Sequence, residues 1–188
     1  MKIVLASKSP RRKEILSLVC DEFEIRVSDA DESYGDDTPL LDVPRILSAR
    51  KAMAVSCAED EIIIGCDTVV LIDNELLGKP KSREKAIEML WKMSGRSHEV
   101  ISGLTLRCGD KIYSEAVSSR VYMRELTKRE IEKYVDVWKP LDKAGAYGIQ
   151  EMAGSFVSRI EGDFYNIVGL PLCRLTEILL TEFGISLS

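Results

Sequence analysis

Six residues near the start of the chain, from Ser7 to Arg12, combine two hydroxyl groups with three cations. Ser9 is a residue type that caps helices and Pro10 suits the first helical position, which predicts a helix starting here. Arg11 and Arg12 then fall in its first turn, where the macrodipole disfavours each cation by about 0.3–1 kcal/mol. A phosphate bridging the backbone N–H groups and both guanidiniums would remove this conflict, with the hydroxyls of Ser7 and Ser9 beside it. The alternative is two solvated arginines on an exposed helix end.

Asp67 is the second candidate, because it lies in the most apolar run of the chain. Nine of its ten flanking residues, within 62–72, are apolar or glycine. A carboxylate buried there without a partner would be strongly unfavourable. On a strand that faces a cleft, it could instead bind Mg²⁺ or accept a proton from water. The alternative is that Asp67 caps a turn or pairs with a core arginine.

Two lysines and the single histidine carry weaker signals. Lys51 lies at the edge of the apolar stripe of a predicted helix, where ordinary snorkelling would also explain it. Lys79 stands in a stiff Gly-Lys-Pro turn soon after Asp67, which favours a cation near that carboxylate. His98 begins a predicted strand, and a structural hydrogen bond is the favoured role for it.

Two loops add one candidate each. Glu32 belongs to an acidic loop over residues 28–38, and such loops are usually solvated, although one carboxylate could reach a shared metal ion. Gln150 belongs to a glycine-rich loop over residues 143–154. Its amide could read the edge of a nucleotide base, or it could satisfy its own backbone.

Composition narrows the class of protein. The 188 residues carry 26 Lys and Arg against 31 Asp and Glu, a net charge of −5, which argues against a dedicated nucleic-acid binder. No stretch approaches about 20 uninterrupted apolar residues, and the apolar start is too short for a signal peptide, so we expect a cytoplasmic protein without a membrane span. Five cysteines without a CxxC pair argue against a zinc or disulfide framework, and most of them are interpreted as small buried side chains.

The elements that must position these residues follow no strict βαβ repeat. Strands are predicted over residues 1–6, 23–27, 62–72, 98–107, 111–125 and 155–160, with a short return strand before residue 78. Helices are predicted from residue 10 to about 19, from about 42, from 82 to 93, from a capping box at 127 to 137, and from 171 to 183. The second helix is expected to turn Met53 and Ala54 inward. We therefore predict an α/β fold with a mixed sheet, flanking helices and two lobes around a cleft, in a single domain over 1–188.

Six ordered segments across essentially the whole chain resemble the signature blocks of the Maf proteins. They are Ser-Lys-Ser-Pro-Arg-Arg-Lys-Glu-Ile-Leu at 7–16, Cys-Asp-Thr-Val-Val at 66–70, Gly-Lys-Pro at 78–80, and the blocks at 94–100, 142–150 and 160–172. One mild departure is Arg50, which replaces a more apolar residue before the family's Lys-Ala pair.

The resemblance implies a fold similar to inosine triphosphate pyrophosphatases and a metal-dependent nucleoside triphosphate pyrophosphatase. Such an enzyme cuts between the α- and β-phosphates and limits the incorporation of unwanted nucleotides. The Asp67-Thr68 pair together with Gln150 resembles the subgroup that acts on dTTP and UTP, and modified pyrimidine nucleotides are further candidate substrates. The implied cofactor is Mg²⁺ or Mn²⁺, with no nucleic-acid or membrane partner and a homodimer left open.

The resemblance also assigns roles. Asp67 is the implied proton acceptor for the attacking water, and Glu32 joins it at the metal. The implied triphosphate-binding residues are Ser7, Arg11, Arg12, Lys51 and Lys79, beside the Ser9 hydroxyl, and those implied in base choice are Arg11, Thr68 and Gln150. The alternatives are a non-catalytic nucleotide-binding regulator of cell division or septum formation, and a kinase or phosphatase that uses the same anion pocket.

Overall fold

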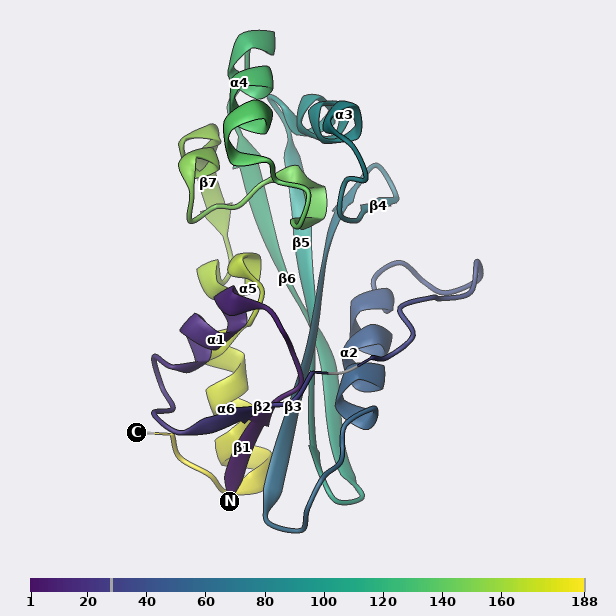
Figure 1. Cartoon of the computed structure of the whole chain (residues 1–188), viewed down its shortest axis with the longest axis vertical. Coiled ribbons are helices and arrows are strands. Elements are labelled where there is room, and N and C mark those ends of the chain that lie inside the picture. The colour runs from purple at the N-terminus through teal and green to yellow at the C-terminus, as the bar shows by residue number, and fades with distance from the viewer. Residues whose placement is uncertain (28, 188) are drawn as a thin grey trace. The chain divides into compact units, whose positions relative to one another are not determined.

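The computed structural model describes residues 1–27 and 29–187 (Figure 1). Its strands are β1 (Lys2–Leu5), β2 (Phe23–Ile25), β3 (Glu61–Ile72), β4 (Glu75–Leu77), β5 (Ser97–Cys108), β6 (Lys111–Met123) and β7 (Val157–Glu161). Its helices are α1 (Pro10–Leu16), α2 (Val43–Met53), α3 (Arg83–Met93), α4 (Lys128–Trp138), α5 (Phe164–Val168) and α6 (Leu172–Phe183), with 3₁₀ turns η1 (Ala144–Ala146) and η2 (Met152–Phe156).

The described strands form one seven-stranded sheet in the order β2-β1-β3-β5-β6-β7, with β4 paired to β3. β1 runs parallel to both β2 and β3, whereas β3 with β4 and β6 with β7 are antiparallel. The predicted α/β fold with a mixed sheet and flanking helices is therefore confirmed. No helix among the described residues is long and apolar enough to cross a membrane.

The chain divides into two compact units. Unit 1 comprises Met1–Thr68, Ser102–Val117 and Tyr165–Ser188, and unit 2 comprises Val69–Ile101 and Ser118–Phe164. The chain passes from one unit to the other within β3, β5 and β6 and at the first residue of α5. A cleft between two lobes stays a prediction.

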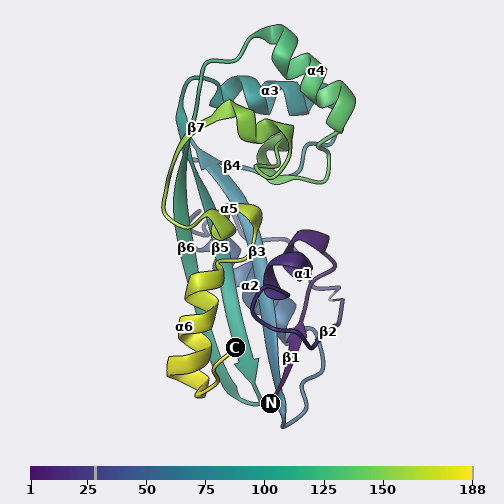
Figure 2. The same cartoon turned by 90° about the vertical axis from the view of Figure 1, so that its left-hand side faces the viewer.

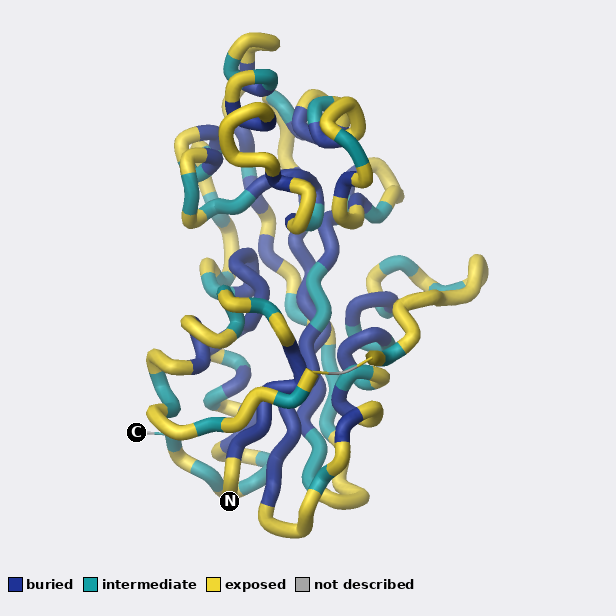
Figure 3. Tube along the Cα trace, in the orientation of Figure 1, coloured by how far each residue is buried: buried dark blue, intermediate teal, exposed yellow. Residues whose placement is uncertain are grey.

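In unit 1 the buried strands explain the apolar run around Asp67. β1 and the first half of β3 are almost continuously buried, as the dark blue trace in Figure 3 shows. α2 lies on one side of these strands, and α1 and α6 lie on the other (Figures 1 and 2). Two glycines let α2 approach closely: a Cβ at Gly65 would lie 2.3 Å from the Ser48 carbonyl oxygen, and one at Gly103 would lie 1.9 Å from that of Pro44. This close approach sets the position of every side chain on α2, including Lys51.

In unit 2 the side-chain caps of α3 and α4 form where the sequence predicted these helices to begin. The side chain of Ser82 accepts from the backbone of Lys85 at the start of α3, and Thr127 and Glu130 form the predicted capping box of α4. α3 contacts α4. The ring of Tyr134 on α4 meets that of Phe156 edge to face, with centroids 5.4 Å apart.

Several local predictions are wrong. α1 ends at Leu16, not near residue 19, and Ser9 takes the N-cap position without a side-chain capping hydrogen bond. Met53 is 53% exposed and Ala54 is exposed, because α2 buries the face of Val43, Leu47 and Ala52 instead.

The cysteines and the turn after β7 also differ from the predictions. Only Cys66 is buried among the five free cysteines; three are partly buried and Cys173 is exposed. The sequence pattern suggested only a turn before α6, where the short helix α5 forms.

Candidate active site

Arg12 is held in a fixed orientation by three neutral acceptors. Its Nε donates to the Gly169 carbonyl oxygen at 2.8 Å, and its two terminal nitrogens donate to the hydroxyls of Ser7 and Thr68, each at 3.2 Å. The first turn of α1 contains no acidic residue, and no carboxylate pairs with Arg12 in residues 1–27 and 29–187. Arg12 therefore keeps an uncompensated positive charge at a helix end that is itself positive.

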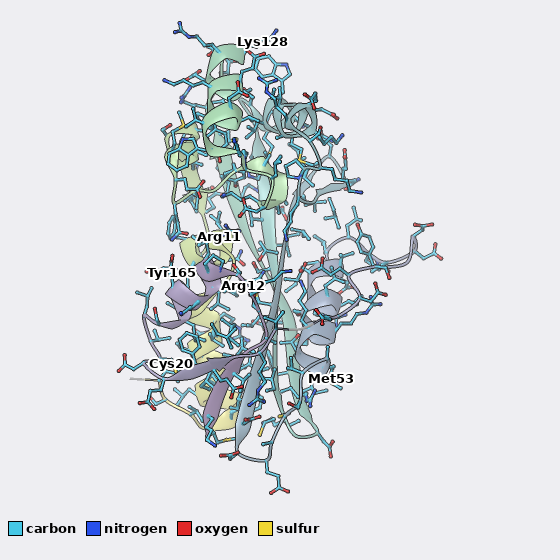
Figure 4. All side chains as sticks on the ribbon, viewed as in Figure 1. Arg11, Arg12, Cys20, Met53, Lys128 and Tyr165 are labelled. Carbon is cyan, nitrogen blue, oxygen red and sulfur yellow. The ribbon has the colours of Figure 1, made fainter. Side chains whose placement is uncertain are left out.

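The two remaining candidates of this segment lie beside Arg12. Arg11 is partly exposed in the same first turn of α1, and Figure 4 labels both arginines there. The backbone N–H of Ser9 donates to the Ser7 hydroxyl at 3.2 Å, so the two serines are linked directly. The predicted helix start is confirmed, and it brings Ser7, Ser9, Arg11 and Arg12 to one end of α1.

Asp67 has a cationic partner, which resolves the problem of a carboxylate in an apolar strand. Lys51 Nζ lies 2.5 Å from Asp67 Oδ1 and 2.8 Å from Glu32 Oε1. The side chains of Lys51 and Asp67 are only 14% and 13% exposed, whereas that of Glu32 is 64% exposed. The partner is thus a lysine from α2 and not the core arginine considered as the alternative.

The charges of this cluster act on one another. Burial acts to lower the pKa of Lys51, but attraction to Asp67 and hydrogen bonds to Asp67 and Glu32 outweigh it, so the pKa lies above its ordinary value. Repulsion from Arg12 also acts to lower the pKa of Lys51, so the two positive charges are close enough to influence each other. Lys51 is therefore a stable ammonium at neutral pH.

Arg50, the one departure from the family pattern, has a local role. It is exposed and donates to the carbonyl oxygens of Ser33 and Asp31, with the Asp31 carboxylate 4.0 Å away. The hydroxyl and backbone N–H of Ser33 bind Asp31 and lower the pKa of its carboxyl group. Arg50 thus ties α2 to the acidic loop that carries Glu32.

Thr68 links the arginine to the rest of unit 1. Besides accepting from Arg12, its hydroxyl lies 2.8 Å from that of Ser102, which donates to the Asn166 carbonyl oxygen at 3.1 Å. Gly169, whose carbonyl binds Arg12, also accepts from the buried Cys66 thiol at 3.1 Å, and burial raises the pKa of that thiol.

Sequence reasoning missed Ser102 and Gly169. Ser102 is fully buried, and its only signal is a small polar residue inside an apolar strand. Gly169 has φ +128°, a region that favours glycine, but this conformation is not visible in the sequence.

Lys79 and Gln150 are exposed residues of unit 2. The backbone N–H of Gly145 donates to the Gly78 carbonyl oxygen at 3.1 Å. The turn that carries Lys79 is therefore fastened to the loop that carries Gln150. That Lys79 lies near Asp67 stays a prediction.

His98 has the structural role predicted for it. It is 3% exposed, and its Nε2 lies 2.7 Å from the Tyr147 hydroxyl. Burial lowers its pKa to about 4, so the imidazole is neutral at physiological pH.

Comparisons with known proteins identify the family of the chain. A family model described as Maf-like protein matches residues 2–182. A dTTP/UTP pyrophosphatase of Alkaliphilus metalliredigens (strain QYMF) is 44% identical, over 99% of this chain and 98% of that protein. Proteins of the same name from Thermosipho africanus (strain TCF52B) and Clostridium novyi (strain NT) are each 42% identical, the first over 95% of this chain and 92% of its own, the second over 100% of both.

One solved structure is more distant. The Ham1 protein of Staphylococcus aureus has a TM-score of 0.45 and 17% identity, covering 68% of this chain and 73% of that one. The family model matches nearly the whole chain, and relatives above 40% identity match over 92–98% of their own length, so this chain belongs to the Maf family.

Proposed function

We propose that this protein is a nucleoside triphosphate pyrophosphatase that cuts dTTP and UTP between the α- and β-phosphates. Its full-length similarity to proteins named dTTP/UTP pyrophosphatase supports the activity. The structural observation that carries the proposal is the charged cluster in unit 1. Lys51 contacts Asp67 there, and the charge of Arg12 acts on Lys51 as well. The products are a nucleoside monophosphate and pyrophosphate, which removes unwanted nucleotides from the cytoplasmic pool.

Asp67 is the proposed proton acceptor. The contact with Lys51 occupies its Oδ1, and no hydrogen bond to Oδ2 occurs among the described residues. Oδ2 accepts the proton of a water whose oxygen forms the new bond to phosphorus. The bond between phosphorus and the bridging oxygen breaks, and pyrophosphate leaves with the electron pair. General-base assistance of this kind contributes about 10²–10⁴-fold.

The cations offset the charge that develops on the phosphate oxygens. Arg12 is oriented by neutral acceptors, so it binds an anion without first breaking an ion pair. Lys51 stays protonated because of its carboxylate partners. Ser7, Ser9, Arg11 and Lys79 are proposed as further contacts of the triphosphate.

The donor set fits a divalent cation that arrives with the substrate. Among the described residues, no group of three or more His, Cys, Asp or Glu side chains could hold a metal alone. Glu32 and Asp67, however, bind the same ammonium group, so one positive charge satisfies both carboxylates. Mg²⁺ typically takes one or two carboxylates together with phosphate oxygens. We propose that Glu32 and Asp67 hold Mg²⁺ or Mn²⁺, which would neutralise phosphate charge when bound.

Base choice is assigned to Arg11, Thr68 and Gln150. The Thr68 hydroxyl is already engaged by Arg12 and Ser102, so its orientation is determined before substrate binds. Gln150 is exposed, which leaves its amide accessible to a base.

The test is product identification. Purified protein is incubated with Mg²⁺ or Mn²⁺ and each of dTTP, UTP, CTP and GTP, and phosphorus NMR identifies the products. The proposal requires pyrophosphate and the monophosphate from dTTP and UTP. Orthophosphate with a nucleoside diphosphate would indicate a phosphatase, and tight nucleotide binding without any product would indicate a regulator; either result contradicts the proposal.

A further inference from the structure

The loop of residues 143–151, which carries Gln150, has a strained backbone within unit 2. Gly145 and Ala146 both adopt left-handed conformations, with φ +67° and +62°. Ala146 is also fully buried, and an alanine in this region persists only when its surroundings hold it there. The loop is therefore not a flexible connection.

Three contacts from other elements hold the loop from outside. The backbone N–H of Gly145 binds the Gly78 carbonyl oxygen at 3.1 Å, and that of Gly148 binds the Tyr134 hydroxyl at 3.3 Å. The hydroxyl of Tyr147 lies 2.7 Å from the neutral imidazole of His98. The one histidine of the chain thus supports this loop.

An ion pair closes the loop from inside. Lys143 Nζ lies 3.2 Å from Glu151 Oε1 and 2.9 Å from Asp142 Oδ1, and the Lys143 side chain is only 9% exposed. A Cβ at Gly148 would lie 2.8 Å from Lys143 Cε and 3.1 Å from Glu151 Oε2. The pair therefore lies directly beneath Gly148 and joins the two ends of the loop.

The turn that ends in Glu151 determines the position of Gln150. The backbone N–H of Glu151 donates to the Gly148 carbonyl oxygen at 3.1 Å, so Gln150 lies inside a closed turn whose last residue is held by Lys143. An amide carries both donors and an acceptor, so it distinguishes a base carbonyl from a base amino group only when its orientation is fixed.

We propose that Lys143 and Glu151 are positioning residues that hold Gln150 and so set the preference for uracil and thymine over cytosine. The inference rests on the proposed function, because it takes Gln150 as the group that reads the base. The ion pair itself is not proposed to touch a reacting atom. Its loss should change the discrimination between bases more than the rate of hydrolysis.

The experiment measures kcat and KM for UTP and CTP in the wild type and in the variants Glu151→Gln, Lys143→Met and the double variant. We expect the ratio of kcat/KM for UTP over CTP to fall at least about fivefold in each single variant, since a displaced hydrogen-bonding group loses selectivity. The double variant should lose no more than either single one, because the two residues act as a unit. The kcat with UTP should stay within about threefold of the wild type.

Two further variants keep the test decisive if the charge variants fold poorly. Gly148→Ala places a Cβ 2.8 Å from Lys143 Cε, so the Lys143 side chain must shift while both charges remain, and the variant should lower the same ratio. Asp136→Asn is the matched control: it removes the exposed Arg83–Asp136 pair, at 2.6 Å in the same unit, and should leave the ratio unchanged.

Three results would overturn the inference: an unchanged ratio in Gly148→Ala and Glu151→Gln despite a lowered Tm, equal losses for both nucleotides, or an unchanged ratio in Gln150→Ala. A wild type that hydrolyses no nucleotide would instead contradict the proposed function. In that case the preference for UTP over CTP would be measured in the same variants as the ratio of the two Kd values, determined by calorimetry.

Discussion

Replacement of Lys51 by Met removes the ammonium group and keeps most of the aliphatic stem. The variant leaves Asp67, 13% exposed, without the cation that lies 2.5 Å from its Oδ1. Removing one partner of a buried ion pair lowers stability by about 3–5 kcal/mol, because the remaining charge is left uncompensated. Because Glu32 is 64% exposed and Asp67 is 13% exposed, we expect a loss of stability at the lower end of this range. A loss of about 3 kcal/mol corresponds to a fall in Tm of about 6–12 °C for a domain of this size.

Asp67→Asn is the matched comparison. Asparagine keeps an oxygen that accepts from Lys51, and Lys51 keeps Glu32 as its partner at 2.8 Å. We expect a loss of about 1 kcal/mol, the typical contribution of one hydrogen bond. Urea unfolding and thermal scans without nucleotide measure both variants. The reasoning is wrong if Lys51→Met is as stable as the wild type, or if Asp67→Asn is the less stable of the two.

Three further predictions follow from single positions. Gly65→Ala places a Cβ 2.3 Å from the Ser48 carbonyl oxygen, so α2 must move: we expect a loss of about 1–3 kcal/mol in urea unfolding and a lower kcat, since Lys51 moves with α2. The pKa of His98 is about 4 in the fold against an ordinary 6.5, so the unfolded chain binds more protons between these values. Stability should therefore fall by up to about 3 kcal/mol as pH drops from about 6.5 to 4, and unfolding of His98→Gln should lack this component. Thr68→Gln should weaken the preference for dTTP and UTP over GTP in competition assays, and unchanged ratios would remove Thr68 from base selection.

The elements that carry the candidate site could be predicted because local patterns determine them. The apolar run around Asp67 predicted β3, and the Ser-Pro start of α1 predicted where both arginines lie. The lysine at the edge of the stripe on α2 contacts Asp67 at 2.5 Å. These features depend on residues a few positions apart, which propensity and periodicity describe well.

The partners within the site could not be predicted because they come from distant parts of the chain. Arg12 and Gly169 are 157 residues apart, and Thr68 and Ser102 are 34 apart. Lys51 reaches Asp67 only because Gly65 lets α2 approach β3, which is a property of packing and not of a helical pattern. Packing also decides the exposure of Met53, because α2 turns the face of Val43, Leu47 and Ala52 inward and leaves Met53 53% exposed.

Asp67→Asn provides the most direct test of the central claim, that this carboxylate takes a proton from water beside bound triphosphate. Pyrophosphate release from UTP with Mg²⁺ is measured in a single turnover, and the affinity for UTP is measured on the same sample. We expect the rate to fall at least about 10²-fold while Kd changes less than about threefold. An asparagine variant that releases pyrophosphate at the wild-type rate, or one that no longer binds UTP, would contradict this role of Asp67.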